Sequence, residues 1–125
     1  MRIRYAFITI IACTVAAAAE PDGRTLFVNH CAACHGPTGE GDGPVASALR
    51  GSVPNLRTLA MRSDGEFPAD EVAAYIDGRT SRVAHGDRLM PVWGDVFADT
   101  EGGDEAAVAA RVEQLVRFIA ELQYR

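Results

Sequence analysis

The sequence predicts an all-α protein with three to five short helices and an unusually large share of loop. No segment alternates apolar and polar residues at the period of two that a half-buried strand requires. Near the C-terminus, apolar residues recur at spacings of three and four, which is the period of a helix with one buried face. Glycine- and proline-rich stretches separate the helical segments, and 125 residues give room for one domain.

The N-terminal residues have the composition of a secretory signal. Two arginines lie in the first four residues, residues 5–15 are almost wholly apolar, and the small residues Ala17, Ala18 and Ala19 directly precede Glu20. This order predicts a signal peptide over residues 1–19, cleaved after Ala19, and a mature domain over residues 20–125. The apolar run is too short to cross a bilayer. The residues around Cys13 leave an alternative open, in which Cys13 is lipidated and tethers the protein to a membrane.

The mature chain is acidic. The full sequence has a formal charge of −5, and removing residues 1–19 takes away two arginines and no acid. An excess of carboxylates argues against nucleic acid as a partner and suits a basic docking protein.

The first helix is expected to start after Asp22, whose carboxylate can cap it, and to stop at His35-Gly36-Pro37. Residues 36–44 hold four glycines and two prolines, so they must form a tightly turning loop. This loop lacks the Gly-Lys-Ser/Thr ending of a phosphate-binding loop, which excludes that function.

The middle of the chain is expected to be mostly irregular. Residues 45–50 suit a short helical turn, and residues 52–57 around Pro54 suit an extended segment. A helix follows, with Pro68 in its first turn and Gly78 as its stop. Residues 79–99 show neither period and predict a long ordered loop, and loops of that length are usually functional.

The last helix has the strongest pattern in the chain. Residues 100–103 form a polar hinge, and Asp104 can cap the helix that follows. The apolar positions of its buried face are Val108, Val112, Leu115, Val116, Ile119 and Leu122.

The string Cys31-Ala-Ala-Cys34-His35 has the C-x-x-C-H spacing of c-type haem attachment. Thiols one helical turn apart can each add to a vinyl group of the porphyrin, and the next histidine then lies under the iron. Two alternatives compete, a redox dithiol and a zinc site. The first lacks a thioredoxin-like βαβ pattern and the second lacks a paired second half, because only His30 and His85 remain.

Further motifs give the chain a resemblance to class I cytochromes c, over residues 22–124. They are Gly23 and Phe27 ahead of the haem motif, Gly-Asp-Gly-Pro ending at Pro44, Pro-Asn-Leu beginning at Pro54, and Met-Pro-Val-Trp-Gly beginning at Met90. The resemblance implies a cytochrome c-like fold, in which the helices wrap around one covalently attached haem c.

The resemblance also implies roles for single residues. His35 and Met90 match the two axial ligands, and the carbonyl of Pro54 matches the acceptor that orients the ligand histidine. Gly23 and Phe27 match the contact between the first and last helices, with Phe118 as the aromatic partner.

Several further residues are candidates for an alternative iron ligand or for contacts with the haem. Met61 is a second methionine, which we interpret as haem-pocket packing because no proline follows it. His85 could replace Met90 on the iron but is interpreted as a surface residue, as is His30. Of the arginines near the distal loop, which are Arg79, Arg82 and Arg88, we favour Arg79 as the partner of a haem propionate. Trp93 could pack on the haem edge and donate its indole proton to a propionate.

The predicted function is one-electron transfer between redox proteins of the bacterial periplasm by a monomer that is not an enzyme. Two strong axial ligands leave no open site for a substrate, and small electron-transfer interfaces are weak and transient. Two alternatives stay open: a haem enzyme or gas sensor with a labile sixth ligand, and a haem subunit of an oxidase or dehydrogenase complex.

Overall fold

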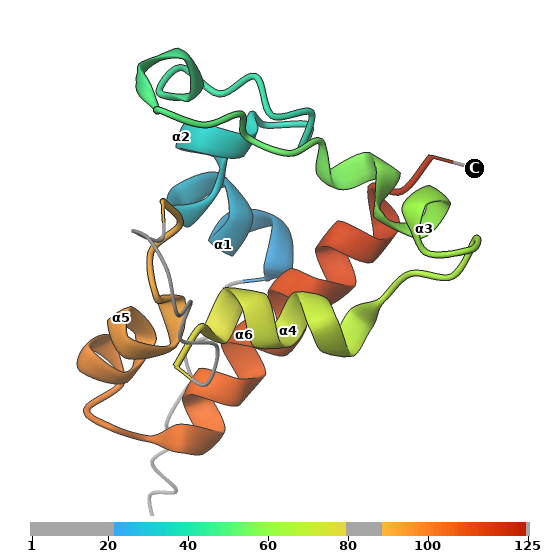
Figure 1. Cartoon of the computed structure of the whole chain (residues 1–125). Coiled ribbons are helices and arrows are strands. Elements are labelled where there is room, and N and C mark those ends of the chain that lie inside the picture. The colour runs from blue at the N-terminus through green and yellow to red at the C-terminus, as the bar shows by residue number, and fades with distance from the viewer. Residues whose placement is uncertain (1–21, 80–88, 125) are drawn as a thin grey trace, which may run out of the picture.

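The computed structural model describes residues 22–79 and 89–124. Within these residues the chain forms helices and turns but no strand, so the predicted all-α class is confirmed (Figure 1). The α-helices are α1 Gly23–His30, α2 Ala32–His35, α3 Leu59–Arg62, α4 Ala69–Asp77, α5 Trp93–Thr100 and α6 Glu105–Glu121, with 3-10 turns η1 Ala46–Ala48 and η2 Leu56–Thr58.

Two predicted caps start the helices at the two ends of the domain. The Asp22 carboxylate accepts a hydrogen bond from the backbone N–H of Thr25 at 2.7 Å, which satisfies one unpaired donor in the first turn of α1. The Asp104 carboxylate does the same for Ala106 and Ala107 at the start of α6. Both helix starts are therefore set by local sequence.

The crossing of α1 and α6 forms the core, and α4 and α5 also pack against α6 (Figure 1). A Cβ atom on Gly23 would lie 2.1 Å from the carbonyl oxygen of Gln114, so only glycine permits this close approach. The Phe27 and Phe118 rings lie 5.3 Å apart, and Phe27 is fully buried. These contacts confirm the predicted meeting of the first and last helices. The buried apolar set is Leu26, Phe27, Cys31, Ile76, Phe97, Val108, Val112, Leu115, Val116 and Ile119.

Helix α5 lies inside the segment expected to be loop, so that prediction was wrong for residues 93–99. The helix has only eight residues, and its N-cap residue, Val92, has no side chain able to cap it. Its buried residues are Gly94 and Phe97, and the Phe97 ring stacks at 5.9 Å on that of half-buried Trp93, one turn earlier. Two helical turns give too short an apolar pattern to stand out within residues 79–99. The single turn of α3 was also not expected, whereas α4 ends at Gly78 in the left-handed conformation, as expected.

Among the residues that the structure describes, none of the helices is long and apolar enough to cross a membrane.

Candidate functional site

The two cysteines and the histidine of the C-x-x-C-H motif lie on one turn of backbone. Cys31 ends α1, and α2 carries Cys34 and His35. The backbone N–H groups of Cys34 and His35 both donate to the carbonyl of Cys31, at 3.2 and 2.9 Å. The cysteines are not joined in a disulfide; Cys31 is buried and Cys34 is half-buried. Two free thiols and an imidazole are therefore presented by one rigid turn.

The environment of Cys31 does not favour this residue as the nucleophile of a redox dithiol. Burial, with a smaller contribution from Cys34, raises the pKa of the Cys31 thiol to about 12. Redox-active cysteines need a pKa lowered by a helix N-terminus or a nearby cation, because the thiolate is the nucleophile. A thioether carries no such requirement, since it does not ionise.

His35 is the buried polar residue at the site, with 9% of its surface exposed. Burial lowers its pKa, and interaction with the backbone of Pro54 partly offsets this effect. The side chain is therefore neutral at physiological pH, which is the form that binds iron. Its Nδ1 atom is buried and makes no hydrogen bond of good geometry to any described residue. The Pro54 carbonyl is the predicted acceptor for this nitrogen, so Nδ1 is not the ring atom expected to bind iron.

The glycine-rich loop folds back on α2 through three backbone hydrogen bonds. The N–H groups of Gly41, Gly43 and Val45 donate to the carbonyls of His35, Cys34 and Ala33, at 2.8, 3.1 and 3.0 Å. A Cβ atom on Gly43 would lie 2.4 Å from the Ala33 carbonyl oxygen. Only glycine fits there. The sequence marked this loop as tightly turned but assigned no role to Gly43, because nothing local shows which backbone lies beneath it.

Of the two candidate methionines, Met90 packs against the buried cluster that contains Cys31, and Met61 does not. Met90 is half-buried. It contacts this cluster although it lies 59 residues beyond Cys31 in the chain. Met61 is 70% exposed near the end of α3. The interpretation of Met61 as haem-pocket packing stays a prediction.

Trp93 lies in an aromatic cluster with two other rings. Its ring lies 5.3 Å from that of His30, edge-on, and 5.9 Å from that of Phe97. His30 also meets Phe97 edge-on at 5.5 Å. His30 was expected at the surface, and the structure places it half-buried, with its ring packed in this cluster. The reason is tertiary, because its partners come from α5, more than sixty residues away.

Arg79 is held by two carboxylates. Its guanidinium donates to Asp77 and to Glu105, with shortest distances of 2.8 Å in each case. These contacts raise its pKa above the ordinary value. A propionate would have to share the guanidinium with them, so that role stays a prediction. His85, Arg82 and Arg88 lie outside the described residues.

A helical domain with a buried histidine and two free thiols on one turn has the arrangement that covalent haem attachment requires. The cytochrome c family model matches residues 21–123, which is most of the chain. The protein therefore belongs to the cytochrome c family, and its cofactor is haem c. No curated protein and no solved structure shows significant similarity to the chain.

The residues present fit that cofactor. Cys31 and Cys34 are free to form the two thioether bonds, and His35 offers an unprotonated imidazole. Membership of the family makes the protein a haem electron carrier with redox proteins as partners, and family members are typically not enzymes.

Proposed function

We propose that the protein is an exported, periplasmic one-electron carrier whose haem iron is bound by His35 and Met90. The observation that carries this proposal is the packing of Met90 against the buried cluster that includes Cys31. The haem motif and the distal methionine are far apart in sequence, yet one apolar cluster connects them. A thioether ligand in apolar surroundings fits a carrier that must retain both ligands in both oxidation states.

Each residue has a separate task in this proposal. Bound haem c supplies a ferric/ferrous couple that takes up and releases one electron. Cys31 and Cys34 prevent its loss, and the loop over α2 restricts water near His35. The Pro54 carbonyl would accept the Nδ1 proton of His35 and so fix the ring orientation. Trp93 would lie against the haem edge, with its indole as the predicted donor to a propionate. Arg79 would reach a propionate only by sharing the guanidinium that already binds Asp77 and Glu105.

The visible spectrum of the matured protein tests the ligand assignment. We expect a weak far-red band in the ferric form, which arises from charge transfer between sulfur and iron, and no response of the reduced form to carbon monoxide. Met90→Ala should abolish the band and open the iron to carbon monoxide. Met61→Ala tests the rival methionine and should leave the band in place.

Other results would contradict the proposal. If the wild-type protein lacks the far-red band or binds carbon monoxide readily, Met90 is not a stable ligand, and an enzyme or sensor function gains support. If Met61→Ala abolishes the band while Met90→Ala does not, the ligand is Met61.

Cell fractionation and intact mass test the location. We expect a periplasmic protein that begins at Glu20 and carries one haem. Recovery in the membrane fraction, with a lipid mass on Cys13, would identify the tethered alternative. Recovery of uncleaved protein without haem in the cytoplasm would contradict export.

A further inference from the structure

We propose that Arg79, with Asp77 and Glu105, is a positioning network that seats helix α5 and so holds Met90 on the haem iron. The inference rests on the proposed function, because it takes Met90 as the distal ligand. In this view the network keeps Met90 bound to the iron, as well as stabilising the fold.

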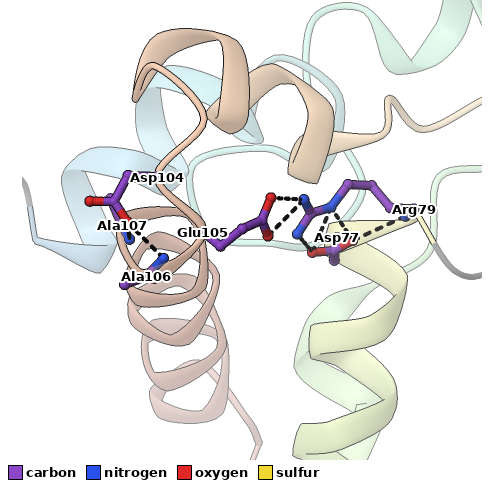
Figure 2. A network of polar contacts seen from close by, with 6 residues as sticks. All are labelled: Asp77, Arg79, Asp104, Glu105, Ala106 and Ala107. Carbon is purple, nitrogen blue, oxygen red and sulfur yellow. Dashed lines mark hydrogen bonds and ion pairs between the residues drawn. The ribbon is translucent and has the colours of Figure 1, made fainter.

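The network joins the end of α4 to the start of α6 (Figure 2). Arg79 Nε and Nη2 donate to the two oxygens of Asp77, at 3.0 and 2.8 Å. Arg79 Nη1 donates to both oxygens of Glu105, at 2.8 and 3.0 Å. The guanidinium thus uses all three nitrogens, and fork-to-fork pairs of this kind fix direction as well as distance.

The position of Asp77 shows why the arginine is needed. Asp77 is the last residue of α4, where a negative charge opposes the helix dipole. Hydrogen bonds from Arg79 nevertheless lower the pKa of Asp77 below its ordinary value. The carboxylate is about three-quarters shielded from solvent, so without the guanidinium its charge would be opposed only by the backbone N–H of Arg79, at 3.0 Å, in a poorly hydrated place. Arg79 therefore determines the structure at this corner.

Helix α5 rests directly on this ion pair. Gly94, in the first turn of α5, is buried, and a Cβ atom there would lie 2.6 Å from Arg79 Nε and 2.8 Å from Asp77 Oδ1. The backbone of α5 can approach so closely only because residue 94 has no side chain. The Asp77 carboxylate also faces the N-terminal turn of α5, where the helix dipole favours negative charge.

The start of α5 determines where Met90 lies. Met90 is four residues before Gly94 and three before Trp93. Trp93 in turn contacts His30, the residue immediately before the haem-attachment Cys31. The first turn of α5 is therefore held at two points, by the ion-pair network against Gly94 and by the contact of Trp93 with His30 of α1. Loosening the network should allow this turn, and the methionine attached to it, to move away from the turn that carries Cys31 and His35.

Imidazole binding to the ferric holoprotein measures this effect. At saturating imidazole the rate is limited by the departure of the native sulfur ligand, so it reports on how firmly Met90 is held. Arg79→Gln and Glu105→Gln should each raise this limiting rate by about two- to fivefold, the range expected for loss of partly exposed ion pairs. In the wild type, raising the salt concentration to about 1 M should also raise the rate, because it screens the contact with exposed Glu105.

Arg117→Gln is the matched control. It removes another arginine–glutamate pair of α6, formed with Glu113 at 3.2 Å, in which both side chains are about two-thirds exposed. Its limiting rate should equal that of the wild type. Glu105→Gln leaves the Asp77–Arg79 pair in place, so this variant should fold even if Arg79→Gln does not.

The outcomes separate the inference from the proposed function. If the wild type has the far-red band but neither network variant exceeds the control in limiting rate, the positioning role is refuted while Met90 remains the ligand. A lower unfolding midpoint with an unchanged imidazole rate would likewise refute it, because the network would then be only structural. If the wild type has no far-red band, the assignment of Met90 fails first, and the inference fails with it.

Discussion

Replacing Gly43 by alanine should loosen the loop that covers the haem-attachment turn. The new Cβ atom would lie 2.4 Å from the carbonyl oxygen of Ala33 and 2.6 Å from that of Ala32. Contacts below about 3 Å cannot persist, and these atoms belong to helical backbone, so the loop must move by several tenths of an ångström. That movement stretches the hydrogen bonds from Gly43 to Cys34 and from Val45 to Ala33.

The expected cost follows from those contacts. Overpacking of a well-packed site costs about 1–3 kcal/mol, and each weakened hydrogen bond contributes about 0.5–1.5 kcal/mol. Because the two costs are alternative outcomes of one movement, we expect Gly43→Ala to lower the free energy of unfolding by about 2 kcal/mol. Urea unfolding of the holoprotein, followed by far-UV circular dichroism, measures this quantity.

Gly51→Ala is the matched control. Its Cβ atom would meet only the tip of the flexible Leu89 side chain, at 3.0 Å, and its backbone does not need a positive φ. The control should change stability by less than about 0.5 kcal/mol. If Gly43→Ala is as stable as Gly51→Ala, the close approach of the loop to α2 does not exist as described, and the argument for Gly43 fails.

Three other substitutions test separate parts of the fold. Gly23→Ala should cost about 1–3 kcal/mol, because its Cβ atom would overlap the Gln114 carbonyl and push α1 off α6; the urea midpoint measures it. Gln123→Ala should cost about 1–3 kcal/mol by the same assay, because it removes hydrogen bonds to the carbonyls of Leu56 and Ile119 and from the N–H of Ala60. His30→Phe should reduce the loss of stability in acid. The pKa of His30 is lowered in the fold, by burial and then by Arg111, so the unfolded chain binds more protons once the pH falls through 6.5. A steeper decline than in the wild type between about pH 7 and 5 would contradict this role.

Local sequence was enough to predict the features that depend on a few consecutive residues. Asp22 and Asp104 cap helices because their carboxylates reach N–H groups only two or three residues ahead. Gly78 ends α4 because glycine adopts the left-handed conformation without steric cost. The placement of Cys31, Cys34 and His35 on one turn follows from their spacing alone, and so does the prediction of covalent haem.

The tertiary structure decided features whose partners are distant in the chain. Helix α5 has no side-chain cap and only two turns, so its helical state depends on burial of Phe97 and on the ion pair beneath Gly94. His30 carried no sign of its aromatic partners, because these lie on α5. The bonds of Gln123 to the segment after Pro54 likewise cross more than sixty residues. Local spacing can specify a turn and its chemistry, whereas close approach between backbones exists only after the helices have packed.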